Sequence, residues 1–119
     1  MKILVCEDNK LSYKTLAVIL GREGYLTDIA EDGNIAIEML EKNFYDLLII
    51  DIHLPFRSGL EIVRYLRTKL KKNTPVIILT AFSDPQMQKE AKELGISEYL
   101  LKPFNPAELI KKIGVLLNN

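Results

Sequence analysis

The chain has 119 residues, of which 48% are hydrophobic and 27% charged, the balance of one globular domain rather than a disordered or fibrous protein. Its 16 basic residues offset its 16 acidic ones, so no net positive field would attract nucleic acid or an anionic membrane. The apolar runs are far shorter than the ~20 residues of a membrane span, and the N-terminus lacks signal-peptide features. We expect one cytoplasmic domain over residues 1–119 that binds neither DNA nor membrane directly.

Five short segments have the composition of β-strands. Three are almost continuously apolar, as is typical of parallel strands covered on both faces: residues 3–6, 47–50 and 76–79. Two mix polar and apolar side chains and are expected at the edges of the sheet: residues 25–29 and 97–101. Cys6, the single cysteine, lies in the first strand and is interpreted as a small buried hydrophobe.

Between these strands the apolar side chains follow a helical period, which predicts five helices. Their core-facing residues are Leu16, Ile19 and Leu20; Ile35, Ala36, Met39 and Leu40; Ile62, Val63, Leu66 and Leu70; Met87, Ala91 and Leu94; and Leu109, Ile113, Leu116 and Leu117. Asp84-Pro85 and Asn105-Pro106 place a capping side chain before a proline, and Glu108 can complete a capping box with Asn105. Gly95 is expected to end the fourth helix.

Strands and helices alternate along the whole chain. Five consecutive βα units predict an α/β domain with a single doubly wound, five-stranded parallel sheet, right-handed crossovers and five helices divided between its two faces. In such a sheet, ligands bind beyond the carboxyl ends of the strands. Residues at those ends are therefore the candidates for function.

Charged and polar side chains occupy that edge. Glu7 and Asp8 follow the first strand, Asp51 ends the third, Thr80 follows the fourth and Lys102 follows the fifth. Carboxylates ~4 Å apart repel by roughly 4 kcal/mol at an effective dielectric near 20, so their convergence favours a bound proton or cation. Magnesium prefers oxygen ligands and keeps positions open for phosphate oxygens, which makes this edge a candidate phosphoryl site.

A plainer explanation is that acidic residues after strands only cap the helices that follow. Capping accounts for Asp8 or Asn9, but the segment from Ile52 to Gly59 delays the next helix and leaves Asp51 unexplained. Thr80 or Lys102 alone carries little information, since such residues are ordinarily solvated or locally bonded. Their joint placement is informative, and the Lys102-Pro103 step, which is compatible with a cis bond, fixes the backbone beside the lysine.

Five short motifs together resemble the signature of the response-regulator receiver family, and the resemblance covers essentially the whole chain. They are Glu7-Asp8, Asp51-Ile52-His53-Leu54-Pro55, Ser58-Gly59, Thr80-Ala81 and Lys102-Pro103-Phe104. The resemblance implies a flavodoxin-like sheet of order 2-1-3-4-5. It also implies a phosphoacceptor of a two-component system or phosphorelay, which receives a phosphoryl group from a sensor histidine kinase or a histidine phosphotransfer protein.

The same resemblance implies a role for each site residue. Asp51 would be the nucleophile and form an acyl phosphate. Magnesium, the expected cofactor, would be held by Glu7 through a water, by the carboxylates of Asp8 and Asp51, and by the backbone carbonyl of His53.

On the phosphoryl side, Lys102 and the hydroxyl of Thr80 would each bind a phosphoryl oxygen, and the small Ala81 would leave room for the group. Thr80 would be coupled to Tyr99, which would turn toward the core on phosphorylation and change the surface offered to a downstream protein. A plain half-buried edge position for Tyr99 is compatible with this role.

His53 is the only histidine and lies two residues beyond Asp51. Histidine prefers softer metals than magnesium, so the side chain of His53 is not expected to bind the metal. We predict instead that this side chain shapes access to the phosphoryl group and so tunes the lifetime of the phosphorylated state. If His53→Ala changes neither the phosphorylation rate nor the hydrolysis rate, this prediction is wrong.

Two other functions remain as alternatives. A phosphorylation-independent binding scaffold would be expected to lack acceptor-site residues, and none is missing. A phosphatase of the haloacid type would carry a second aspartate where His53 stands. We therefore expect no enzyme activity beyond the domain's own phosphorylation and slow dephosphorylation. The absence of an arginine after Pro106 argues against the dimer of DNA-binding relatives, so we expect a standalone monomer or a weak phosphorylation-dependent dimer.

Overall fold

The structure is a computed structural model that describes residues 1–118, in which strands and helices alternate. The strands are β1 (Lys2–Cys6), β2 (Leu26–Ala30), β3 (Leu47–Asp51), β4 (Val76–Thr80) and β5 (Glu98–Leu101). The helices are α1 (Lys10–Arg22), α2 (Gly33–Lys42), α3 (Gly59–Thr68), α4 (Pro85–Glu93) and α5 (Pro106–Asn118). All five predicted strands and all five predicted helices are present.

The strands form one parallel sheet in the order β2-β1-β3-β4-β5, which confirms the expected fold and places both mixed strands at its edges. β3 and β4 each run one residue further than predicted. Asp51 pairs with Leu79, and Thr80 pairs with Leu101. Asp51 and Thr80 are therefore the last residues of two neighbouring central strands, with their backbones fixed by the sheet.

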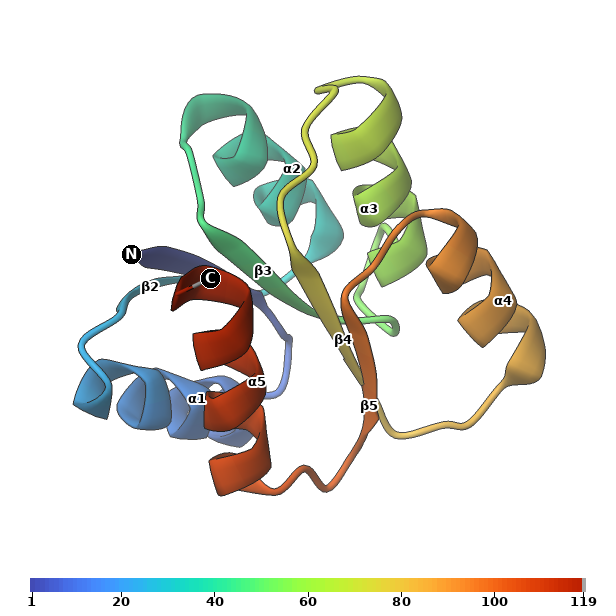
Figure 1. Ribbon diagram of the computed structural model, residues 1–119. Coiled ribbons are helices and arrows are strands. Elements are labelled where there is room, and N and C mark those ends of the chain that lie inside the picture. Colours follow the sequence, from blue (N-terminus) through green and yellow to red (C-terminus); the bar gives the residue numbers. More distant parts are fainter. Residues whose placement is uncertain (119) are drawn as a thin grey trace.

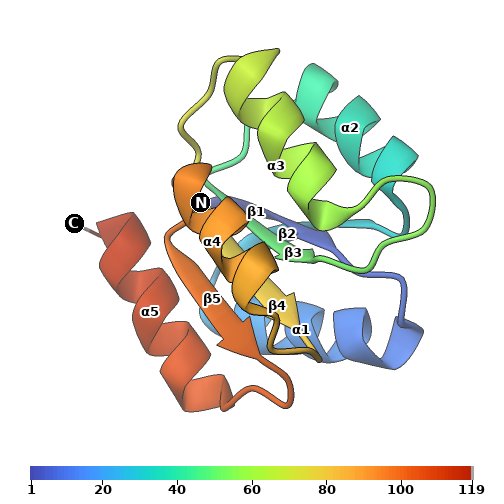
Figure 2. The same ribbon diagram turned by 90° about the vertical axis from the view of Figure 1, so that its right-hand side faces the viewer.

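Helices cover both faces of the sheet, because successive side chains of a buried strand point to opposite sides. Figures 1 and 2 show α1 and α5 on one face and α2, α3 and α4 on the other. Ile3 and Val5 pack on the α1 and α5 side, whereas Leu4 and Cys6 pack on the opposite side. Cys6 is buried, and this burial raises the pKa of its thiol, as expected for an inert core cysteine.

Side-chain caps set the starts of the helices. The predicted cap of α4 is confirmed, since Asp84 Oδ1 accepts from the backbone N–H of Gln86 at 2.9 Å. At α5 the Glu108 N–H donates to Asn105 Oδ1 at 3.0 Å, but the Glu108 carboxylate lies 4.0 Å from Lys112 Nζ. The complete capping box belongs instead to α3, between Ser58 and Glu61.

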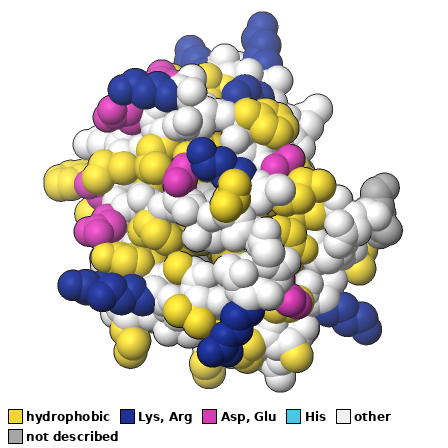
Figure 3. Space-filling model, turned by 90° about the vertical axis from the view of Figure 1, so that its left-hand side faces the viewer, with side chains coloured by type: hydrophobic (Ala, Val, Ile, Leu, Met, Phe, Trp, Pro, Cys, Tyr) yellow, Lys and Arg dark blue, Asp and Glu magenta, His cyan; other side chains and the backbone are white. Residues whose placement is uncertain are grey.

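The surface carries apolar side chains between charged ones. Figure 3 views the side that lies at the left of Figure 1, where hydrophobic side chains form several small groups rather than one continuous patch. Within residues 1–118, every helix is too short or too polar to cross a membrane.

Candidate functional site

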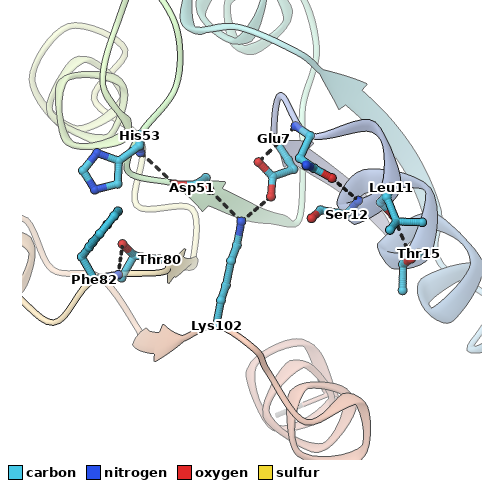
Figure 4. A network of polar contacts seen from close by, with 10 residues as sticks. Glu7, Leu11, Ser12, Thr15, Asp51, His53, Thr80, Phe82 and Lys102 are labelled. Carbon is cyan, nitrogen blue, oxygen red and sulfur yellow. Dashed lines mark hydrogen bonds and ion pairs between the residues drawn. The ribbon is translucent and has the colours of Figure 1, made fainter.

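Three of the predicted residues meet at the carboxyl edge of the sheet, around the ammonium group of Lys102. Lys102 Nζ donates to Asp51 Oδ2 at 2.7 Å and also to Glu7 Oε1 (Figure 4). Glu7 follows β1, Asp51 ends β3 and Lys102 follows β5, so the parallel sheet brings together residues up to 95 positions apart. The Lys102-Pro103 peptide bond is cis.

The charges at this point are unbalanced, because two carboxylates share one ammonium group. Glu7 is only 3% exposed, and its burial raises the pKa of its carboxyl; the hydrogen bond from Lys102 lowers it, and the nearby Asp51 raises it further. Burial disfavours the charge on Lys102, but its bonds to Asp51 and Glu7 outweigh burial and raise its pKa. Two carboxylates therefore share one ammonium group, and a further cation would balance the second carboxylate when both are ionised.

Asp51 is held from two directions. Its Oδ2 binds Lys102, while its Oδ1 accepts the backbone N–H of His53 at 2.8 Å. Behind it, α3 begins so close that a Cβ on Gly59 would lie 2.6 Å from the Asp51 carbonyl oxygen. Only glycine fits there, which explains the Ser58-Gly59 motif as a packing requirement on the backbone of Asp51.

Thr80 is fully buried at the end of β4, and its Oγ1 accepts the backbone N–H of Phe82 at 3.2 Å. The ring of Phe82 meets the ring of His53 edge to face, with their centroids 5.1 Å apart (Figure 4). These two rings thus link the loop after Asp51 to the loop after Thr80. Sequence reasoning missed Phe82; its position two residues beyond Thr80, matching that of His53 beyond Asp51, was the available signal.

Tyr99 is half-buried on β5 and packs against the core formed with α2, α3 and α4. Its hydroxyl is buried without a hydrogen-bond partner, and it is the sole such side-chain atom in the described part of the chain. Burial and the nearby Asp84 carboxylate both raise the pKa of Tyr99. The tyrosine therefore combines the expected edge position with an unsatisfied hydroxyl near Asp84, the residue that caps α4.

The four predicted metal ligands are brought together only in part. Glu7 and Asp51 converge, whereas Asp8 is exposed and stands outside the Lys102 network. The predicted ligand atom of His53 is its backbone carbonyl, and the His53 backbone lies beside Asp51, since its N–H donates to Asp51 Oδ1. The exposed His53 side chain contacts Phe82, in agreement with the expectation that it does not bind the metal. Over residues 1–118, no three His, Cys, Asp or Glu side chains are arranged as a ready metal cluster. Two carboxylates with excess negative charge nevertheless fit the oxygen ligands that magnesium prefers.

A groove of ≈ 480 Å³ borders the site on the α1 side. Its walls are largely apolar, including Leu11 on α1 and Phe104 after β5, and its polar lining includes Glu7 and Lys102. Two members of the charged cluster, Glu7 and Lys102, are thus part of the wall of this groove.

Comparison with known proteins gives the same family along nearly the whole chain. A model of the response regulator receiver domain matches residues 3–114. The transcriptional regulatory protein ResD of Bacillus subtilis is 39% identical over 117 residues, which are 98% of this chain and 48% of that protein. The chain therefore spans about half the length of this curated relative.

Solved structures agree with the sequence comparison. The receiver domain of the Francisella response regulator 1452 superposes with a TM-score of 0.91 at 34% identity, covering 98% of this chain and 96% of that one. The receiver domain of the sensor histidine kinase PA1611 from Pseudomonas aeruginosa superposes with a TM-score of 0.88 at 28% identity, covering 99% of this chain and 98% of that one. That structure has magnesium coordinated in its active-site cleft. The chain belongs to the response regulator receiver domain family.

Proposed function

We propose that this domain is a cytoplasmic phosphoacceptor whose acceptor is Asp51 and whose donor is the phosphohistidine of a sensor kinase or histidine phosphotransfer protein. The observation that carries the proposal is the pairing of Lys102 Nζ with both Asp51 and the buried Glu7 at the carboxyl edge of the sheet. An ammonium fixed 2.7 Å from the acceptor carboxylate can bind an oxygen of an incoming phosphoryl group.

The transfer requires one bond to form and one to break. An oxygen of Asp51 attacks phosphorus, the bond to the donor imidazole nitrogen breaks, and an acyl phosphate results. Lys102 and Thr80 provide an ammonium and a hydroxyl for the phosphoryl oxygens, and Ala81 leaves space beside them. Glu7, Asp8, Asp51 and the His53 carbonyl would hold Mg²⁺, which supplies charge neutralisation for the transferred group.

Output would follow from Thr80 and Tyr99. Movement of Thr80 toward a phosphoryl oxygen, to which its hydroxyl would donate, would carry Oγ1 away from the Phe82 N–H and shift the loop after β4. Such coupling is typically worth ~1 to 3 kcal/mol, so the change is a shift in populations between two packings that a downstream protein distinguishes. The domain would act on itself only, without a separate substrate.

Intact-mass spectrometry after incubation with acetyl phosphate tests the proposal. One added phosphoryl group is expected in the presence of Mg²⁺ and not after its removal with EDTA. The binding-scaffold alternative predicts no adduct under any of these conditions, including brief incubations in the cold that slow hydrolysis.

A further inference from the structure

Helix α4 is attached to the domain differently from its neighbour α3, beside which it lies in Figures 1 and 2. α3 buries five of its residues, whereas in α4 only Ala91 is buried. Its nine residues span about 13 Å at 1.5 Å per residue. Polar contacts must therefore contribute much of what holds α4 in place.

Those contacts gather at the carboxyl end of α4, on the guanidinium of Arg67 from α3. Arg67 Nε donates to the carbonyl of Leu94, the C-cap residue of α4, at 2.9 Å. Nη2 donates to the carbonyl of Gly95 at 3.3 Å, and Nη1 donates to that of Lys72 at 2.9 Å. A charged fork at a helix carboxyl end satisfies carbonyls that the helix leaves unpaired and interacts favourably with the helix dipole.

The amino end of α4 has no comparable anchor in the described residues. Asp84 caps its own helix through the N–H groups of Gln86 and Met87. The preceding loop is exposed at Phe82, and the unpaired hydroxyl of Tyr99 lies near Asp84, the residue that caps α4. A buried hydroxyl without a partner is unfavourable, so a loop movement that brings it an acceptor would be favoured.

We propose that Arg67 is a fixed pivot about which α4 tilts, so that the amino end moves with Thr80 while the carboxyl end stays in place. The pivot rests on the proposed function, because phosphorylation of Asp51 supplies the displacement at Thr80. Arg67 touches no reacting atom and is a positioning residue. Its effect is to convert a local change in the loop after β4 into a rotation of one surface helix.

Hydrogen exchange measured by mass spectrometry on the full chain tests the pivot, with and without beryllofluoride and Mg²⁺ as a phosphoryl mimic. In the wild type, the mimic is expected to change exchange in residues 82–90 and leave residues 92–97 unchanged. In Arg67→Lys, which keeps the charge and loses the fork, exchange in residues 92–97 is expected to rise about five-fold even without the mimic.

In the same variant, the response to the mimic should spread into residues 92–97, which a merely structural role would not produce. Arg64→Gln is the matched control. Arg64 lies one turn earlier on α3 and pairs with the Glu90 side chain in the last turn of α4 at 2.7 Å, but it binds none of the carbonyls that Arg67 holds. It should leave residues 92–97 within about two-fold of the wild type.

Two results would overturn the pivot: a wild-type response as large in residues 92–97 as in 82–90, or unchanged exchange of residues 92–97 in Arg67→Lys. The wild-type measurement decides the first without any variant. Labelling with acetyl phosphate in parallel separates the two proposals. Absence of an adduct would remove the proposed function together with the pivot, whereas an adduct with either overturning result would remove the pivot alone.

Discussion

Two lysine–carboxylate clusters lie toward opposite ends of the same sheet, and their charges are balanced differently. Toward the amino ends, Asp28 accepts the Tyr45 hydroxyl at 2.7 Å and lies 3.2 Å from Lys2 Nζ. At the carboxyl ends, Lys102 must serve both Glu7 and Asp51. The hydrogen bond from Tyr45, aided by Lys2, lowers the pKa of Asp28, whereas burial raises the pKa of Glu7.

The two clusters differ in how many carboxylates each ammonium group must serve. The amino-end cluster matches one carboxylate with one ammonium and adds a hydroxyl donor, so each charge is compensated. The carboxyl-end cluster leaves negative charge uncompensated beside two connecting loops, where a cation and a phosphoryl group can enter. On the proposed function, similar residue types therefore stabilise the fold at one end of the sheet and receive a phosphoryl group at the other.

The largest effect is expected from Lys102→Ala, which removes the ammonium from the acceptor site. The initial rate of labelling by acetyl phosphate, followed by intact mass, should fall about 10²-fold, because a preorganised charge no longer stabilises the phosphoryl oxygens. Lys2→Ala makes the same change in the amino-end cluster and should alter this rate less than about two-fold. Equal losses in the two variants would contradict the division of roles.

Tyr45→Phe tests the structural cluster. Loss of the hydroxyl that donates to Asp28 should lower the free energy of unfolding by about 1.5–3 kcal/mol, the usual contribution of a hydrogen bond to a charged group. Urea unfolding measures the change, and labelling of Asp51 should be unaffected. Tyr13→Phe, which removes an exposed bond to Glu31, is the control and should cost less than about 0.5 kcal/mol.

Tyr99→Phe should change the free energy of unfolding in the opposite direction to Tyr45→Phe. Its hydroxyl is buried without a partner, so its removal should raise the free energy of unfolding by about 1 kcal/mol in the unphosphorylated domain. The same urea experiment measures it. A loss of stability as large as that of Tyr45→Phe would show that the Tyr99 hydroxyl has a partner in solution.

The smallest effect concerns pH. Because the pKa of Asp28 is lowered from 3.8 on folding, its ionised form stabilises the fold fully above that value, and the contribution is lost as pH falls through the folded-state pKa. Asp28→Asn should thus lower the urea midpoint near pH 6 more than near pH 3. A difference that grows toward low pH would reverse the sign we assign.

Sequence patterns were sufficient for the number, order and type of the strands and helices and for the Asp84 cap of α4, but they placed the capping box at α5 instead of α3. Continuously apolar runs identified the central strands, and mixed polar and apolar runs identified the edge strands β2 and β5. Because the strands are parallel, Glu7, Asp51 and Lys102 were expected at the same edge of the sheet. Loop conformation depends on tertiary contacts that no local pattern encodes. The exposure of Asp8, the contact between His53 and Phe82 and the three carbonyls bound by Arg67 therefore emerged only from the structure. The effect of His53 on phosphoryl lifetime stays a prediction.

The central claim is that Asp51 is the acceptor, and reductive trapping tests it most directly. The domain is phosphorylated with acetyl phosphate and Mg²⁺ and treated with borohydride, which converts an aspartyl phosphate to homoserine, and its peptides are then sequenced by mass spectrometry. We expect homoserine at position 51 in the wild type. We expect no homoserine at any position in Asp51→Asn treated in the same way. Homoserine at Asp8 or at another aspartate, or 5-hydroxynorvaline, the corresponding reduction product of a glutamyl phosphate, at Glu7 while Asp51 remains intact, would contradict the assignment.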